Sequence, residues 1–476
     1  MNTTINEKPL DERLAMLEKT RAWSPRTISK LEGLIRTGDD FSLFRINPIK
    51  FSTEKNIPEN EAIDLFLFGS KYLLFDMNWN LICPGCSDIV SSFRTLKTLH
   101  SHFYCNVCHV STEASLDDYI QIAFTISPEI REIAFHHPES LSVEDYYFKY
   151  RFYSDAKYPN GLRFADVVSK VMKCLSYISP KGKACFDIEV APGFLSGGDL
   201  MNGADVVFEI NGETKPEKQN LSLKLMDGKF EPRSGVLSPG KVTLEIENTM
   251  DRKGSILLTN LPAGGGAGVL NIGNFLSGKR ILTSQTFRDL YRTEVIQGTE
   301  GIGVKDIAVL FTDLKGSTAL YDKIGDLKAF SLVRQHFDSL GKVVVKNSGA
   351  IVKTIGDAVM ATFMNPFDAV NSAIEMLKEI EEFNRGLKGK EIILKIGIHK
   401  GHSIAVTLND RLDYFGTTVN IASRVQELAD AEEIYITEDV YSYPKVQELL
   451  RGLNVAPENA RLKGIHEEMK VYKITY

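Results

Sequence analysis

The chain has 476 residues, of which 43% are hydrophobic and 25% charged, and its net charge at pH 7 is −6. These values are typical of globular protein and argue against a disordered, collagen-like or fibrous chain. The negative charge does not favour broad electrostatic binding to nucleic acid or to an anionic membrane. No apolar run reaches the ~18–20 residues of a membrane-spanning helix, and charges occupy the place of a signal peptide's apolar stretch. We therefore expect a soluble, cytoplasmic protein of about three domains.

Residues 1–75 are predicted to be helical. Apolar residues between positions 62 and 69 recur at helical spacing, and Pro58 stands just ahead of them as a start signal. Before them, the segment DDFSLFRINPIKF (residues 39–51) is an apolar patch that Asn47-Pro48 interrupts with a turn signal. We expect both segments to pack in a core.

Residues 76–115 are predicted to form a zinc-ribbon-like module. Cys83-x-x-Cys86 and Cys105-x-x-Cys108 are separated by 18 residues, a spacing typical of paired zinc-binding knuckles. Four thiolates would close a tetrahedral Zn²⁺ site and leave no position for a substrate, so this zinc would be structural. A redox pair or unligated core cysteines are the alternatives, and one of three nearby histidines could replace a cysteine: His100, His102 or His109.

The other two cysteines, Cys174 and Cys185, are isolated and are expected to be buried free thiols. Zinc ribbons often bind nucleic acid, but the segment between the knuckles is only thinly basic, with Arg94 and Lys97. Nucleic-acid binding is therefore not favoured, and a folding or protein-contact role is preferred for the module.

The middle of the chain divides into three segments. Residues 116–178 are assigned only weakly, as an α+β region of unknown role. Residues 179–262 hold short strands punctuated by turn residues, which predicts a small β-sandwich: ACFDIEV, ADVVFEI, LSLKLMD, KVTLEIEN and GSILLTN. Residues 263–303 begin with the flexible sequence GGGAG after Pro262-Ala263 and include FRDLYRTE, so they are predicted to be a linker or transducer.

Residues 304–476 alternate between strand-like and helix-like patterns. A buried strand run ends at Asp313, and two later strand runs, AIVKTI and AVMATF, are separated only by Gly356-Asp357, a hairpin signal. The order β-α-β-β-α-β is that of a ferredoxin-like sheet, in which the first strand and the hairpin are central neighbours. We therefore expect Asp313 and Asp357 to meet.

Two carboxylates at strand ends supply the hard oxygen ligands that Mg²⁺ or Mn²⁺ requires, and substrate phosphates can complete the shell. Backbone N–H groups between Leu314 and Thr318, which include Gly316 and Ser317, would face the phosphates at a helix start. The plainer interpretation is that Asp313 caps the helix and Asp357 is only a turn residue.

Three segments, FTDLKGST, KTIGD and DYFGTTVNIASR, resemble the signature motifs of the class III nucleotide cyclases, in the order and spacing of that family. The resemblance covers residues 304–476. Two upstream segments, DMNWNLICPGC and FRDLYRTEV, resemble bacterial soluble cyclases with an amino-terminal zinc-ribbon-like region. The expected fold class is therefore multidomain α+β, with a ferredoxin-like cyclase domain after the β-sandwich.

The resemblance also implies roles for individual residues. Asp313 and Asp357 would hold two metal ions, and Asn420 and Arg424 would be catalytic, orienting the ribose and stabilising the pentavalent phosphate. The positions expected to bind substrate are Lys353 and Asp413, which match the base-reading pair, and Lys395 and Lys463, which match phosphate contacts. Without the motifs, Arg424 would read as a surface charge and Lys395 as an edge residue. His399 and His402 resemble no ligand set and are expected to be structural.

A Lys donor and an Asp acceptor complement adenine N1 and its 6-amino group, whereas guanine presents the reverse pattern. The expected reaction converts ATP to 3′,5′-cyclic AMP and pyrophosphate. In this family two domains pair head to tail, so a chain with both half-sets of residues predicts a homodimer. Its first 300 residues would regulate it through an unknown ligand or protein. The alternatives are a guanylate-specific or promiscuous cyclase, a silent nucleotide-sensing scaffold, and a palm-type nucleotidyltransferase.

Overall fold

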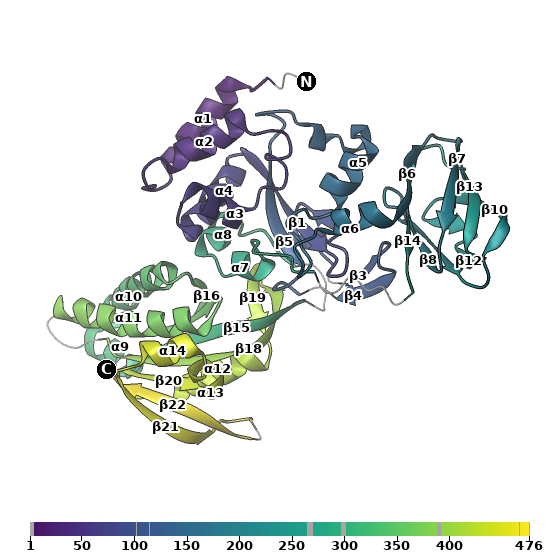
Figure 1. The fold of residues 1–476 in the computed structure, drawn as a ribbon. Coiled ribbons are helices and arrows are strands. Elements are labelled where there is room, and N and C mark those ends of the chain that lie inside the picture. The colour runs from purple at the N-terminus through teal and green to yellow at the C-terminus, as the bar shows by residue number, and fades with distance from the viewer. Residues whose placement is uncertain are drawn as a thin grey trace.

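A computed structural model describes residues 4–100, 102–113, 115–263, 270–296, 301–387, 392–465 and 467–475. Figure 1 shows an amino-terminal unit of helices around a small sheet, a β-sandwich on one side of it and a C-terminal α/β domain below. Within the described ranges, no helix has both the length and the apolar character needed to cross a bilayer. The expected multidomain α+β fold is confirmed.

The amino-terminal unit packs four helices against a three-stranded sheet of order β2-β1-β5. Fully buried aromatic rings such as Phe66, Trp79 and Phe124 fill the space between the two layers. Strand β5 pairs with β1 along seven residues, so the sheet joins segments that the sequence assigns to different regions. The elements are α1 (Glu7–Glu18), α2 (Thr27–Thr37), α3 (Pro48–Lys55), α4 (Glu59–Lys71), β1 (Phe75–Ile82), β2 (Ile89–Phe93) and β5 (Ile120–Ile126).

Shorter elements connect this sheet to the sandwich. The first knuckle lies between β1 and β2, and the second forms the turn of the β3–β4 hairpin. A one-turn α5 continues into a π-helical segment. The bounds are η1 (Leu96–Thr98), β3 (His102–Cys105), β4 (Val110–Glu113), η2 (Ala134–His136), η3 (Pro138–Ser140), α5 (Val143–Asp145), η4 (Tyr146–Arg151) and α6 (Phe164–Val171).

The β-sandwich has one sheet of order β11-β10-β13-β7 and one of order β12-β9-β8-β14-β6. All five predicted strands are present, and their alternate residues face one shared core, as in β13. Its strands are β6 (Met172–Ile178), β7 (Lys183–Val190), β8 (Gly193–Asp199), β9 (Ala204–Ile210), β10 (Lys215–Met226), β11 (Lys229–Glu231), β12 (Ser234–Leu237), β13 (Gly240–Asn248) and β14 (Gly254–Leu261).

Sequence patterns missed β8 because of its glycines. A Cβ at Gly197 or Gly198 would lie 1.9 or 2.1 Å from a backbone oxygen of a neighbouring strand, which is far inside van der Waals contact. The expectation that both isolated cysteines are buried is wrong for one of them. Cys174 is buried, but Cys185 is exposed because the alternation of β7 turns it to the outer face of its sheet.

The C-terminal domain is an eight-stranded sheet of order β16-β17-β15-β18-β20-β22-β21, with β19 on β18. Its first six main elements follow the predicted β-α-β-β-α-β order, except that Gly325 divides the first helical segment in two. The elements are β15 (Ile302–Leu314), α9 (Ser317–Ile324), α10 (Asp326–Lys346), β16 (Ala350–Ile355), β17 (Ala358–Phe363), α11 (Pro366–Arg385), β18 (Leu394–Leu408), β19 (Arg411–Phe415), α12 (Thr417–Leu428), β20 (Glu433–Thr437), α13 (Glu438–Tyr441), α14 (Pro444–Leu449), β21 (Asn454–Arg461) and β22 (Glu468–Thr475).

The two faces of this sheet are covered differently. Ala308 and Leu310 of β15 lie in the core that α10 and α11 cover. The alternate residues Val309 and Phe311 lie in one continuous core with the amino-terminal unit. Strand β15 is thus buried from both sides, and the amino-terminal unit rests on the back of the C-terminal sheet.

The predicted linker or transducer makes much of this junction. Part of it, residues 264–269 and 297–300, lies outside the described residues. The rest forms α7 (Gly278–Leu282) and α8 (Gln285–Leu290), which lie between the two units in Figure 1. The side chain of Gln285 accepts a hydrogen bond from the Ile351 N–H at 2.8 Å, and Arg288 donates to the Leu412 carbonyl at 3.0 Å.

The buried His399 should make the C-terminal domain less stable in acid. Its ring is 5% exposed, Nδ1 lies 2.9 Å from Thr437 Oγ1, and burial lowers its pKa to about 4. The unfolded chain, with a histidine pKa of about 6.5, takes up the proton first, so this contribution to stability is present above pH ~6.5 and is lost toward pH 4. The loss amounts to roughly 3 kcal/mol.

We expect His399→Gln to flatten the decline of unfolding free energy between pH 7 and pH 5, measured by urea titration. Part of the decline should remain in this variant, because burial also lowers the pKa of His336 to about 4. The control is His137→Gln, since the His137 side chain is 61% exposed and should leave the slope unchanged. An unaltered slope in His399→Gln would contradict the assignment.

Candidate functional site

Two carboxylates meet at one end of the C-terminal sheet. Asp313 is the penultimate residue of β15, and Asp357 lies in the tight turn between β16 and β17. The ladder pairs Thr312 with Val359, which places the two aspartates at the same edge. Gly356 adopts a positive φ of 63° in that turn, which explains why glycine precedes the aspartate.

The surroundings of these two carboxylates are suited to a divalent cation. Asp357 Oδ2 is buried and has no hydrogen-bond donor among the described residues. Leaving a buried carboxylate oxygen without a partner is costly, and a hard cation satisfies such an oxygen. Asp313 is paired with the ammonium of Lys395 at 2.7 Å across β15 and β18. The donor set and its charge therefore suit Mg²⁺ or Mn²⁺.

The turn after β15 offers fewer free N–H groups than its sequence suggests. Leu314 is paired with Leu394 in the sheet, and Lys315 donates its N–H to the Ile393 carbonyl at 2.9 Å. The start of α9 remains, where Gly316 has φ 74° and is followed by Ser317 and Thr318. An anion at this turn would therefore face residues 316–318 rather than the whole segment from 314.

A second group of charges lies in a hollow between β16 and β19. Lys353 Nζ contacts Asp413 Oδ2 at 2.5 Å, and the other oxygen of Asp413 accepts the N–H of Tyr414 at 2.8 Å. The Asp413 side chain is only 9% exposed. These strands are not neighbours in the sheet, so the pair forms because the β18–β19 hairpin curls back toward β16. Residues 352–354 and 408–413 line the hollow.

The third group lies on α12. Asn420 is exposed, and Arg424, one turn later, is 37% exposed and pairs with Glu427. Among the described residues, neither contacts Asp313 or Asp357. Lys463 is also exposed, in the turn after β21, and makes no contact with the carboxylates. The chain thus forms each of the first two groups from its own residues but leaves Asn420 and Arg424 facing outward.

The position of α12 depends on two glycines that the sequence reasoning did not single out. A Cβ at Gly397 of β18 would lie 2.1 Å from the Gln426 nitrogen, and one at Gly401 would lie 2.7 Å from Thr418 Oγ1. The four-residue spacing of these glycines along β18 was the available signal. They let the helix lie directly on the strand.

Arg288 of α8 was also missed. Besides the Leu412 carbonyl, its guanidinium donates to the Leu282 carbonyl at 2.9 Å and lies 5.5 Å from the centre of the Tyr414 ring. It therefore contacts the residues on either side of Asp413. Its place in FRDLYRTE was the only sequence signal.

The four cysteines of the knuckles converge. Their Sγ atoms all lie within 4.8 Å of one another, and three of the four residues are buried. Burial raises the pKa of the Cys86 thiol, so a bound cation is needed to favour its thiolate. Four sulfurs at this spacing fit one soft, tetrahedral metal ion. His109, a candidate replacement ligand, pairs instead with Asp205 at 2.9 Å.

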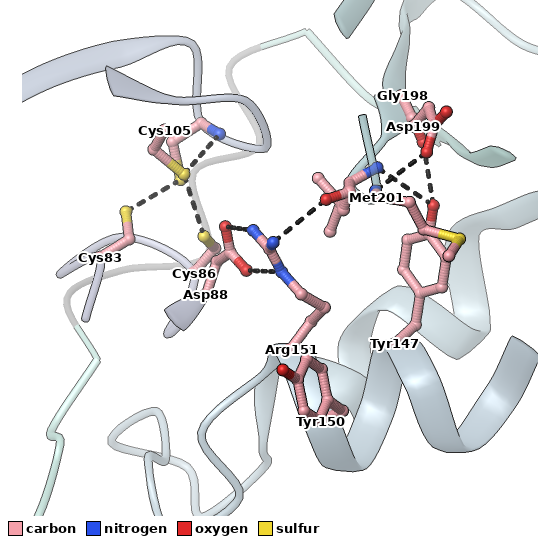
Figure 2. A network of polar contacts seen from close by, with 12 residues as sticks. Cys83, Cys86, Asp88, Cys105, Tyr147, Tyr150, Arg151, Gly198, Asp199 and Met201 are labelled. Carbon is pink, nitrogen blue, oxygen red and sulfur yellow. Dashed lines mark hydrogen bonds and ion pairs between the residues drawn. The ribbon is translucent and has the colours of Figure 1, made fainter. Parts of the chain in front are cut away.

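A buried ion pair connects this cluster to the sandwich. In Figure 2, Asp88 follows the first knuckle and faces Arg151 with both oxygens, at 2.9 and 2.8 Å. Arg151 also donates to the Leu200 carbonyl in the turn after β8. There, Asp199 accepts from Ser255, whose hydroxyl contacts that of Tyr147 at 2.7 Å.

Two known protein families match two consecutive parts of the chain. Residues 9–289 match a family of unknown function, DUF5939, and residues 302–475 match the adenylate and guanylate cyclase catalytic domain. The chain belongs to the DUF5939 family and carries a class III cyclase domain. The family resemblance of the three C-terminal motifs is thereby confirmed.

Relatives of the cyclase domain include enzymes for both nucleotides. An adenylate cyclase of Anabaena cylindrica is 30% identical over 198 residues, 37% of this chain and 39% of that protein. A receptor-type guanylate cyclase of Caenorhabditis elegans, gcy-13, is 25% identical over 162 residues, 32% of this chain and 16% of that protein. The chain therefore spans well under half the length of these relatives.

Among solved structures, the adenylyl cyclase CyaB of P. aeruginosa is 23% identical, with a TM-score of 0.33, covering 37% of this chain and 97% of that one. The guanylate cyclase domain of RhGC from Catenaria anguillulae in complex with GTP is 22% identical, with a TM-score of 0.32, covering 36% and 97%.

The cysteine cluster should hold one metal ion per chain. Elemental analysis of the purified protein is expected to find one equivalent, which Cys86→Ser reduces to a small fraction because three sulfurs cannot close the site. Cys174→Ser, which alters a buried cysteine of the sandwich, should retain the full equivalent. A metal-free wild-type protein with four titratable thiols would contradict this assignment.

Proposed function

We propose that the cyclase domain converts ATP to 3′,5′-cyclic AMP and pyrophosphate. The observation that carries this proposal is the contact between Lys353 and Asp413 in a hollow between β16 and β19. An ammonium donor and a carboxylate acceptor match adenine N1 and the 6-amino group, and they mismatch guanine at both positions. In the free chain each group satisfies the other, and adenine would replace that contact with two of its own.

Asp313 and Asp357 would hold two Mg²⁺ or Mn²⁺ ions at the end of the sheet. Bound there, the ions would lower the pKa of the ribose 3′-hydroxyl and offset charge on the phosphates. Lys395, already beside Asp313, would turn its ammonium to a phosphate oxygen once that carboxylate binds a cation. The N–H groups at the start of α9 would contact the same phosphates.

The remaining catalytic groups would come from a second copy of the chain. Asn420 and Arg424 share an outward face of α12, apart from the carboxylates of their own chain. In a head-to-tail homodimer, Asn420 of the partner subunit would orient the ribose, and Arg424 of the partner subunit would stabilise the charge that develops on the transferring phosphoryl group. Lys463 would add a further phosphate contact. Each dimer would then have two equivalent sites.

Zinc is the metal that best fits the four sulfurs. Its role would be structural, because a closed Cys₄ shell has no open position for a substrate. The amino-terminal unit would regulate the cyclase domain through α8, whose Arg288 contacts the strand of Asp413. Guanylate cyclase activity remains the competing function, because relatives of both kinds match the domain.

Turnover of the purified chain with ATP and GTP, offered separately with Mg²⁺ or Mn²⁺, tests the substrate and the carboxylates together. We expect cyclic AMP from ATP and little product from GTP. Asp357→Asn should lower kcat/KM by roughly 10²–10³-fold, since a ligand of the metal ions is lost without a change of shape. Asp338→Asn on the exposed face of α10 is the matched control and should keep full activity.

Preferential turnover of GTP would replace the proposal with a guanylate cyclase. Absence of both products in an intact, metal-loaded protein would favour a catalytically silent scaffold. Full activity in Asp357→Asn would remove the role proposed for the carboxylates.

Mixing two inactive variants tests the shared site. Asp357→Asn and Arg424→Ala should each be inactive as homodimers, but an equal mixture should recover roughly a quarter of wild-type activity, because each mixed dimer has one intact site. The mixture is measured after subunit exchange, with each variant alone at the same total concentration. A mixture as inactive as its components would place all the catalytic groups within one chain.

A further inference from the structure

The amino-terminal unit contains a cleft of about 350 Å³ that the proposed function does not use. One wall is the segment that precedes α3, together with α3 itself, and the other is the end of η4 with the residues that follow it. Apolar side chains, among them Phe41, Phe51 and Phe152, line its interior. Its volume is within the range of small-molecule sites.

Arg45 lies in this cleft in a fixed position. Its backbone has φ 49°, an uncommon conformation for a residue other than glycine. The next residue, Ile46, exchanges two backbone hydrogen bonds with Phe124 at the side of the sheet, at 2.7 and 3.0 Å. This bridge fixes the backbone on one side of Arg45, and the Arg45 N–H donates to Thr125 Oγ1 at 3.2 Å.

Two aromatic rings orient the guanidinium. It lies 4.6 Å from the centre of the Phe44 ring and 4.9 Å from that of Tyr150, and those rings stack on each other at 5.4 Å. One of its nitrogens donates to the Tyr150 carbonyl. Such cation–π contacts fix the direction of the guanidinium but occupy none of its remaining N–H donors.

No carboxylate pairs with Arg45 among the residues that the structure describes. Asp88, an acidic group whose charge acts on Arg45, gives both of its oxygens to Arg151, as Figure 2 shows. The cleft is lined by four cationic side chains and only two acidic ones, Glu54 and Asp155, and Asp155 is paired with Lys50 at 2.8 Å.

Arg45 is partly buried, and withdrawing part of a guanidinium from water without a counterion destabilises the folded chain. Consistently, burial, with a smaller effect of the neighbouring charge on Arg151, lowers the pKa of Arg45 to about 10. A bound anion would reverse both effects, and a planar carboxylate or a phosphate matches the geometry of the guanidinium fork.

We propose that this cleft binds a small organic anion, whose carboxylate or phosphate group pairs with Arg45 while its apolar or aromatic body packs against Phe51 and Phe152. The site is separate from the proposed nucleotide site, because it lies wholly in the amino-terminal unit. It assigns a ligand-binding role to a segment that its apolar sequence alone marked only as core.

Thermal unfolding of the whole chain with added anions tests the site. The probes are benzoate, which carries a carboxylate, phenyl phosphate, which carries a phosphate, and benzyl alcohol as the uncharged control, all at one ionic strength. We expect benzoate or phenyl phosphate to raise Tm by about 2 °C or more and benzyl alcohol to leave it unchanged. The anion with the larger shift identifies the preferred head group.

The matched pair of variants is Arg45→Gln and Arg26→Gln. Arg26 is also an arginine at positive φ, 67°, but it is exposed and outside the cleft. Arg45→Gln should abolish the Tm shift, whereas Arg26→Gln should retain it. If Arg45→Gln fails to fold by circular dichroism, Arg45→Lys replaces it, with an expected loss of affinity of roughly tenfold by calorimetry because the planar fork is gone.

Two outcomes would overturn the proposal. One is the absence of any shift in the wild-type protein with both anions. The other is an equal shift in the Arg45 variant and the wild type, which would mean that the anions bind elsewhere.

Discussion

The burial of β15 on both faces is the constraint on which the rest of the structure depends. One face of this strand completes the core under α10 and α11, and the other belongs to the core of the amino-terminal unit. The enclosed stretch of this strand, residues 307–311, is apolar throughout, whereas Lys305 just before it is exposed and Asp313 appears at the sheet end. The amino-terminal unit and the cyclase domain therefore share one hydrophobic core, and the hydrogen bonds of α8 add polar contacts to it.

Much of the C-terminal domain could be predicted from sequence because its signals are local. The Gly356-Asp357 turn fixes the hairpin, and the hairpin fixes which carboxylates meet. Other features depend on distant parts of the chain. The pairing of β5 with β1 joins segments about 40 residues apart, and the hydrophobic periodicity of neither segment indicates its partner strand. The curl that brings Lys353 to Asp413 and the contact of α12 on Gly397 likewise arise from tertiary packing, so the family resemblance gave the residues but not their geometry.

Two charge pairs of the proposed site are balanced in the free chain. Lys353 faces Asp413, and Lys395 faces Asp313, whereas Asp357 Oδ2 has no hydrogen-bond partner among the described residues. Binding would exchange these partners instead of burying new charge, which limits the desolvation penalty. Arg45 is the contrast, because no carboxylate pairs with it among the described residues and Asp88 is already engaged by Arg151. At the proposed nucleotide site, the ligand would replace a charged partner within the chain. In the Arg45 cleft, the ligand would supply a counterion that the chain does not provide.

The alternation of β19 has a consequence for communication between the units. Leu412 and Tyr414 belong to the core shared with the amino-terminal unit, while Asp413 between them points to Lys353. A strand is too stiff to move one residue without its neighbours, and successive side chains project to opposite sides. A displacement at the Arg288 contact would therefore reach the Asp413 carboxylate, proposed to read adenine, through a single peptide unit, and the two halves of the chain would need no hinge to influence one another.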